Sequence, residues 1–155
     1  MRKKKILIVD DDPDVRLSLH KRLQAHEYDT YEASDGVTCM SEARKVQPDL
    51  ILLDLGLPAG DGFESMKRLH NIPTLSTIPV IIISGRDRRS HQKEAAALGA
   101  RAFLEKPVNN AVLLQAIRSV LGEQSRTEEP AVYNLVDPYQ ETPPEPVRQA
   151  VTRRS

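Results

Sequence analysis

The sequence predicts an α/β fold, a doubly wound parallel sheet with helices on both of its faces. Three observations favour it. Short apolar runs rich in β-branched residues alternate with amphipathic segments of helical period. The apolar runs are continuous and lack the alternation of apolar and polar residues that marks a half-buried strand. Continuous runs are typical of strands buried on both faces. The alternation of strands with helices implies right-handed crossovers between parallel strands.

Five segments are predicted as strands. Four are continuous apolar runs, at residues 6–9, 50–53, 80–83 and 102–104. Residues 29–33 form a weaker candidate of mixed polarity, which suits a strand at the edge of a sheet.

The first and last helices carry the clearest terminal signals. Asp12 is a typical N-cap and stands before Pro13, a residue favoured in the first helical turn. Asn109 is the expected N-cap of the last helix. Apolar residues spaced three or four apart give each helix one buried stripe. These stripes are Val15, Leu19 and Leu23 in the first helix and Leu113, Ile117 and Val120 in the last.

Three further helices are predicted between the later strands. The second spans about residues 36–46, with Val37, Met40 and Ala43 facing inward. The third spans about 61–70, with an apolar face of Phe63, Met66 and Leu69, and the fourth spans about 87–98 and ends at Gly99, a typical C-terminal glycine.

Polar residues follow each of the four apolar strands. Because parallel strands present their carboxyl ends at one edge of the sheet, these residues should meet there although they are far apart in the sequence. The expected pocket holds at least three carboxylates, a hydroxyl group and an ammonium group. The contributing residues are Asp10, Asp11 and Asp12, then Asp54, then Ser84, and finally Glu105 and Lys106.

This set of side chains suits phosphoryl transfer. Packed carboxylates repel one another unless a cation lies among them, and oxygen ligands favour Mg²⁺ or Mn²⁺. A lysine and a hydroxyl group would help to neutralise and position a phosphoryl group. A carboxylate can itself be the nucleophile, and Asp54 is the natural choice, with Asp10 and Asp11 holding the metal beside it.

The constellation resembles the receiver domain of two-component response regulators over roughly residues 4–121. The motifs that carry the resemblance are Asp10-Asp11-Asp12-Pro13, Asp54-Leu55-Gly56-Leu57-Pro58 followed by Asp61-Gly62, Ser84-Gly85, and Lys106-Pro107. Their spacings also agree with the family. The resemblance implies a flavodoxin-like (βα)5 fold whose five parallel strands have the order 2-1-3-4-5.

The resemblance also implies a phosphoacceptor and a metal site. Asp54 would accept a phosphoryl group from a histidine kinase or a histidine phosphotransfer protein. Mg²⁺ would be held by Asp11 directly, by Asp10 through water, by Asp54 and by the backbone carbonyl of Gly56. In contrast, Asp12 is expected to be a helix cap.

A second group of residues would read out the phosphorylated state. Lys106 would pair with the phosphate, acting with Asp54 as a catalytic residue, and its bond to Pro107 would be cis. Ser84 would move toward the phosphate and Phe103 would change rotamer, which would repack the face of the fourth helix, fifth strand and fifth helix. Arg86 lies at a variable rim position and is expected to alter the phosphoryl lifetime.

The expected function is therefore a phosphorylation-controlled protein-interaction switch, not an enzyme beyond its own phosphotransfer and dephosphorylation. Two alternatives remain within the family: a receiver fragment whose output domain is missing, and a pseudo-receiver adaptor that works without phosphorylation. A haloacid-dehalogenase-type phosphatase is disfavoured, since such enzymes carry a second acid two residues after the nucleophile and this chain has Gly56 there.

Composition sets outer limits on the function. The 155 residues carry 22 basic and 22 acidic side chains, and a net charge of zero disfavours non-specific binding to nucleic acid or anionic membranes. One cysteine, Cys39, excludes an intramolecular disulfide and is expected to be a buried helix residue. No apolar run is long enough to span a membrane, so a cytoplasmic protein is expected.

The domain boundary is predicted near residue 122. Residues 1–122 form the receiver domain, and residues 123–155 form a proline-rich, flexible tail with no pattern for a DNA-binding helix-turn-helix. No direct DNA binding is therefore expected. A short apolar segment, residues 131–136, interrupts the tail; it either rests on the domain or docks on a partner, and the first interpretation is favoured.

Overall fold

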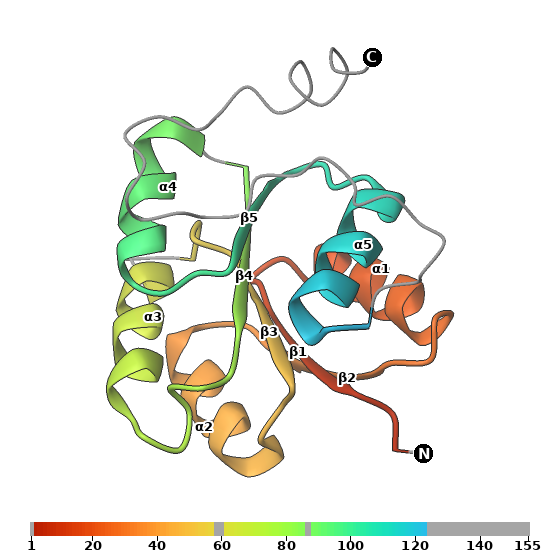
Figure 1. The fold of residues 1–155 in the computed structure, drawn as a ribbon, viewed down its shortest axis with the longest axis horizontal. Coiled ribbons are helices and arrows are strands. Elements are labelled where there is room, and N and C mark those ends of the chain that lie inside the picture. The colour runs from red at the N-terminus through yellow and green to blue at the C-terminus, as the bar shows by residue number, and fades with distance from the viewer. Residues whose placement is uncertain (1, 58–60, 86–87, 124–155) are drawn as a thin grey trace, which may run out of the picture.

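The computed structural model describes residues 2–57, 61–85 and 88–123 (Figure 1). Its five strands form one parallel sheet in the order β2-β1-β3-β4-β5, which confirms the predicted fold class and strand order. The strands are β1 (Lys5–Val9), β2 (Asp29–Ala33), β3 (Leu50–Leu53), β4 (Val80–Ser84) and β5 (Ala102–Glu105).

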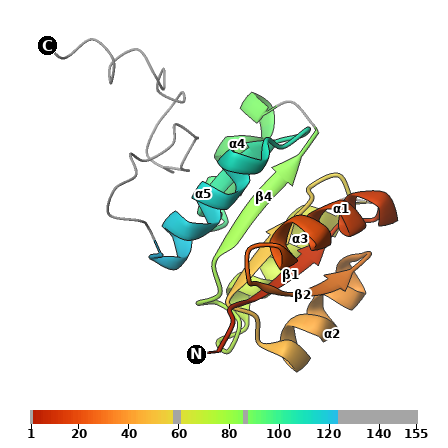
Figure 2. The same ribbon diagram turned by 90° about the vertical axis from the view of Figure 1, so that its right-hand side faces the viewer.

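Five helices connect and follow these strands, and they cover both faces of the sheet. In Figure 1, α1 and α5 lie on one face while α2, α3 and α4 lie on the other, and Figure 2 is viewed from the side of α1 and α5. The helices are α1 (Pro13–Gln24), α2 (Gly36–Val46), α3 (Asp61–Asn71), α4 (Arg88–Ala97) and α5 (Asn110–Leu121).

The central strands are apolar at every position because both faces of the sheet are buried. In β1, Ile6 and Ile8 belong to the core beneath α1 and α5, whereas Leu7 and Val9 belong to the core beneath α2, α3 and α4. None of these four side chains is more than 1 % exposed. β2 lies at the edge of the sheet, as its mixed polarity predicted.

Side-chain caps fix the starts of three helices. The carboxylate of Asp12 accepts a hydrogen bond from the backbone N–H of Asp14, so Asp12 is the predicted N-cap of α1. Asn109 caps α5 in the same way. Asp35 and Thr38 form a reciprocal capping box at α2 that the sequence analysis did not anticipate.

One inward-facing residue was predicted wrongly. Val37 is 72 % exposed, while Met40 and Ala43 are buried as expected. The buried stripe of α2 is Gly36, Cys39, Met40 and Ala43, which repeats at intervals of three and four residues. Val37 follows Gly36 by one position and is therefore rotated out of that stripe by about 100°.

Cys39 is buried and is expected to resist thiol reagents. Its side chain is 0 % exposed and contacts the hydroxyl group of buried Ser65 on α3, and burial raises the pKa of the thiol to about 12. Because the thiolate is the reactive species, a disulfide reagent at about pH 8 should modify the native protein roughly a thousandfold more slowly than the denatured chain. Rapid stoichiometric labelling without denaturant would contradict this burial.

The membrane and tail predictions have different outcomes. None of the helices in the described residues has the length and apolar character that a bilayer span requires.

α5 ends at Leu121 and is followed by Gly122 in the left-handed conformation, with φ of 76°. Residues 124–155 lie outside the described residues, so the flexible tail and the boundary before it stay predictions.

Candidate functional site

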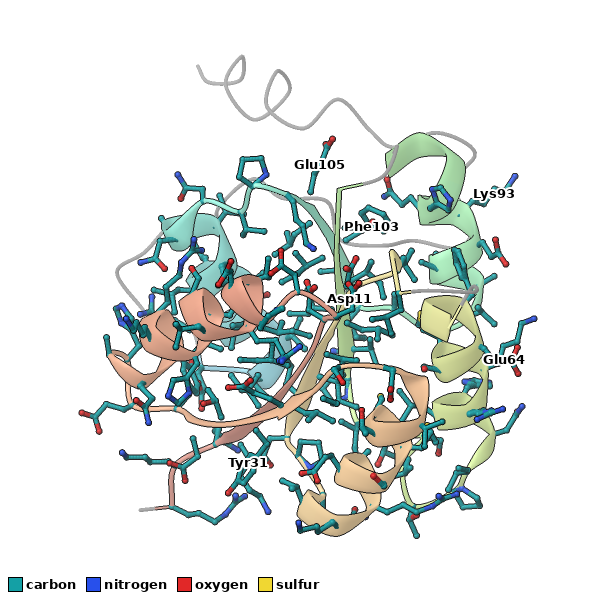
Figure 3. All side chains as sticks on the ribbon, turned by 180° about the vertical axis from the view of Figure 1, so that it is seen from behind. Asp11, Tyr31, Glu64, Lys93, Phe103 and Glu105 are labelled. Atoms are coloured by element: carbon teal, nitrogen blue, oxygen red, sulfur yellow. The ribbon has the colours of Figure 1, made fainter. Side chains whose placement is uncertain are left out.

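Three carboxylates meet at the carboxyl edge of the sheet. Asp10 and Asp11 follow β1, and Asp54 follows the neighbouring β3. One side-chain oxygen from each of the three residues lies within 4.8 Å of the others. Asp10 and Asp54 are buried, at 3 % and 5 % exposure, while Asp11 is exposed where β1 ends (Figure 3). The predicted acidic pocket is therefore present.

Lys106 joins two of these carboxylates. Its Nζ lies 2.8 Å from Oδ2 of Asp10 and 3.2 Å from Oδ2 of Asp54. Lys106 follows β5, so its side chain must extend past the end of β4 to reach Asp54 after β3 and Asp10 after β1. The position of this ammonium group in the pocket was predicted from the sequence, but its pairing with Asp10 was not.

Backbone amides hold the other oxygen of each buried carboxylate. The N–H of Gly56 donates to Oδ1 of Asp54 at 2.8 Å, and the N–H of Asp12 donates to Oδ1 of Asp10 at 2.9 Å. Each carboxylate is thus fixed by a backbone amide on one side and by Lys106 on the other. Bonds of this kind stabilise the charged form and set the direction in which the carboxylate points.

The pocket remains short of positive charge in spite of these contacts. Burial, followed by the neighbouring charge of Asp10, raises the pKa of Asp54 above its ordinary value, although the Gly56 amide and Lys106 act in the opposite direction. Burial alone would lower the pKa of Lys106, but its hydrogen bond to Asp10 and the charge of Asp54 outweigh that effect and raise it. A further cation would relieve the remaining repulsion.

The residues present fit a hard divalent cation. Asp10, Asp11 and Asp54 supply oxygen atoms only, and oxygen ligands are those that Mg²⁺ and Mn²⁺ prefer. The exposed Asp11 leaves the cluster open to solvent, so waters or phosphate oxygens can fill the remaining positions. The part assigned to the backbone carbonyl of Gly56 stays a prediction.

Comparison with known proteins agrees with this geometry. The family model described as response regulator receiver domain matches residues 6–118. The chain belongs to this family. Receiver domains generally bind Mg²⁺ at an acidic pocket, which corresponds here to Asp10, Asp11 and Asp54.

Individual relatives support the same conclusion. Protein PilH of Pseudomonas aeruginosa is 35 % identical over 117 residues, which cover 76 % of this chain and 97 % of PilH. Response regulator PleD of Caulobacter vibrioides is 38 % identical over 117 residues, 75 % of this chain but 26 % of PleD. The chain therefore matches nearly all of PilH and about a quarter of PleD.

Solved structures confirm the fold of this receiver domain. The chemotaxis protein CheY4 of Vibrio cholerae superposes with a TM-score of 0.73 at 28 % identity, covering 77 % of this chain and 99 % of CheY4. A response regulator from Chloroflexus aurantiacus superposes with a TM-score of 0.74 at 27 % identity. The match covers 78 % of this chain and 99 % of the other.

The residues expected to act as switches in this receiver lie beside the pocket. Ser84 is fully buried at the end of β4, and its carbonyl accepts a hydrogen bond of 2.9 Å from the N–H of Lys106. Phe103 is 1 % exposed in β5 and belongs to the same core as Ala95 of α4 (Figure 3). The Lys106–Pro107 peptide bond is cis, as the resemblance implied. The movements of Ser84 and Phe103 stay predictions.

The rim of the pocket is open above the predicted acceptor. A Cβ atom at Gly56 would lie 3.2 Å from Oδ1 and 3.4 Å from Oδ2 of Asp54. Glycine therefore keeps space beside the carboxylate that any other residue would reduce. The second rim position, Arg86, lies outside the described residues, so its effect on phosphoryl lifetime stays a prediction.

Arg16 is a positioning residue that the sequence analysis missed. Its Nη1 donates to the backbone carbonyl of Asp10 at 2.7 Å, while its Nε pairs with Oε1 of Glu32 at 3.0 Å. It therefore ties the loop after β1 to the end of β2. The available signal was its place three residues before Leu19, at the border of the buried stripe of α1, where an arginine is unusual without a partner.

Gly62 is a second residue whose importance becomes clear only in three dimensions. A Cβ atom there would lie 2.6 Å from the Cα of Leu55 and 2.9 Å from the carbonyl oxygen of Asp54. We expect Gly62→Ala to push α3 away from the loop that carries Asp54 and to cost about 1–3 kcal/mol of stability in denaturant unfolding.

Gly85→Ala is the matched control for this change. Among the described residues, the only atom within 4 Å of its added Cβ would be the Cβ of Lys106, at 4.0 Å, which is an ordinary contact. Its unfolding free energy should stay within about 0.5 kcal/mol of wild type. Equal stabilities of the two variants would contradict the close approach at Gly62.

Proposed function

We propose that this chain is a phosphoryl-accepting receiver that works as a Mg²⁺-dependent protein-interaction switch. Asp54 takes a phosphoryl group from a histidine kinase or a histidine phosphotransfer protein. The observation that carries the proposal is the joint placement of Asp10, Asp11 and Asp54 within one cluster, with Lys106 bound to two of them, in a chain of the receiver family.

The chemistry follows from the described geometry. An Oδ atom of Asp54 attacks the phosphorus, a P–O bond forms, and the P–N bond to the donor histidine breaks, which returns the electron pair to the imidazole. Asp54 is held for this by the Gly56 amide at Oδ1. Asp10, Asp11 and Asp54 would hold Mg²⁺, which would supply charge neutralisation for the phosphoryl oxygens. Lys106, already 3.2 Å from Oδ2 of Asp54, adds a second positive charge.

The switch would use the elements next to the pocket. Ser84 and Lys106 flank Asp54, and a backbone hydrogen bond joins the N–H of Lys106 to the carbonyl oxygen of Ser84. Movement of Ser84 toward the phosphate and of Phe103 within the core would change the face formed by α4, β5 and α5, where a downstream protein would bind. The chain acts on no separate substrate, does not contact DNA directly and works in the cytoplasm; these are parts of the same proposal.

A small phosphodonor tests the central claim. Incubation of the full chain with acetyl phosphate and Mg²⁺ should add one phosphoryl group, visible in the intact mass, and a chelator should prevent the addition. Beryllofluoride with Mg²⁺ should shift the amide resonances around the pocket. Absence of both effects would favour the pseudo-receiver alternative.

A further inference from the structure

An apolar groove lies beside the pocket, between α1 and the loop that leads from β5 to α5. It has a volume of about 490 Å³. One hydrogen bond joins its two walls, from Nη1 of Arg22 to the carbonyl oxygen of Val108 at 3.1 Å. Lys106 lines the groove as well as contacting Asp54, so the groove borders the phosphoacceptor site. Its other lining residues include Val15, Ser18, Leu19 and Pro107.

The chain itself contains a segment of matching character. Residues 131–136, with the sequence Ala-Val-Tyr-Asn-Leu-Val, are the longest mainly apolar stretch after residue 123. Acidic residues flank this segment, namely Glu128 and Glu129 before it and Asp137 after it. The charged residues at the groove walls are Asp14, Arg22 and Lys106, and Lys106 is already paired with Asp10 and Asp54. Arg22 is therefore the groove cation that the acidic flanks of the segment can meet.

The length of the intervening chain is sufficient to bring the two together. Glu123 lies at the opposite edge of the sheet from Lys106, because its Oε1 accepts a hydrogen bond of 3.0 Å from the hydroxyl group of Tyr28, just before β2. The twelve residues of α5 cover about 18 Å of this separation. Residues 124–130 can span about 23 Å when fully extended, so residue 131 can reach the groove.

We propose that residues 131–136 dock in the groove between α1 and the β5–α5 loop of the same chain. Docking buries the apolar side chains of Val132, Tyr133 and Leu135 against an apolar surface that solvent otherwise covers. The docking itself does not depend on the proposed function.

A spin label on the segment tests the docking directly. Cys39 is buried, so a nitroxide attached to Asn134→Cys in the full chain will mark residue 134 alone. We expect it to broaden the amide signals of Val15, Ser18 and Val108 selectively. A label at Thr152→Cys, beyond the segment, should not produce this pattern.

Paired substitutions show whether the contact is specific. Leu135→Asp, combined with the label at residue 134, should restore the signals of the groove, whereas Tyr139→Asp outside the segment should leave them broadened. On the groove side, Ser18→Glu should also restore them. Gln24→Glu is its matched control, because Gln24 is an exposed neutral residue of α1 outside the groove lining.

Each other outcome would overturn the proposal. Uniform broadening, or broadening centred on another surface, would show that the segment does not occupy this groove. Broadening that also appears when a spin-labelled chain is mixed with an unlabelled, isotope-enriched chain would assign the groove to a second copy. None of these measurements involves phosphorylation, so failure of the docking and failure of the proposed function are distinguishable.

Discussion

Asp54→Asn should reduce phosphoryl incorporation from acetyl phosphate and Mg²⁺ to the background of the assay. The amide side chain has no anionic oxygen with which to attack phosphorus. It nearly matches the size of the carboxylate and can still accept the hydrogen bond from Gly56, so the surrounding loop should keep its structure. Intact-mass spectrometry of wild type and variant, treated in parallel, measures the difference.

Asp12→Asn provides the matched control. Asp12 follows Asp11 directly and is exposed, but its carboxylate caps α1 and is not part of the cluster of three aspartates. Asparagine is an equally good N-cap, so this variant should be phosphorylated like wild type. Equal labelling of Asp54→Asn would show that another residue is the acceptor, and loss of labelling in Asp12→Asn would show that the metal site has been assigned wrongly.

The gathering of the acidic residues could be predicted from the sequence because a parallel sheet restricts where the residues after each strand can lie. Once the apolar runs are taken as parallel strands, every residue that follows a strand lies at the same edge. Asp10, Asp54 and Lys106 meet there, as predicted. The detailed pairing could not be predicted, because the contact between Lys106 and Asp10 depends on how one flexible side chain crosses β4.

The errors and omissions have a common physical origin. Val37 was predicted to face inward because a short helix offers two overlapping sets of apolar residues spaced three or four apart. Only the way α2 packs on the sheet decides which set is buried. The close approach of Gly62 to Leu55 is a distance between α3 and a loop, which no local pattern encodes. Likewise, the hydrogen bond from Arg16 to the carbonyl oxygen of Asp10 depends on how α1 is positioned relative to the end of β1, which the sequence pattern does not specify.

Lys106→Met should lower the stability of the metal-free protein. Methionine keeps most of the aliphatic stem but removes the ammonium group that Asp10 and Asp54 share, so two buried carboxylates lose their cation. Because Lys106 is 26 % exposed, solvent compensates part of the loss, and we expect a cost of about 2 kcal/mol. Urea unfolding in the presence of a chelator measures it, with Lys67→Met on the exposed face of α3 as the control.

The cost should depend on pH in a definite direction. The pKa of Asp54 is already raised in the folded protein, chiefly by burial, so the folded state retains a proton at pH values where the unfolded state has lost it. This charged group therefore opposes folding at neutral pH, and its effect fades as the pH falls. Removing Lys106 raises the pKa of Asp54 further, so the stability deficit of Lys106→Met should be largest at neutral pH and shrink in acid.

Two additional measurements separate charge from packing at Lys106. Mg²⁺ should restore much of the stability of Lys106→Met, because a bound cation replaces the missing positive charge among the aspartates. Adding Asp54→Asn to Lys106→Met should also reduce the deficit, since only one buried carboxylate then remains, and the double-mutant cycle gives the coupling energy between the two residues. A deficit that neither pH, Mg²⁺ nor Asp54→Asn changes would instead mean that Lys106 stabilises the fold through its stem, and that the acidic pocket does not need a cation to fold.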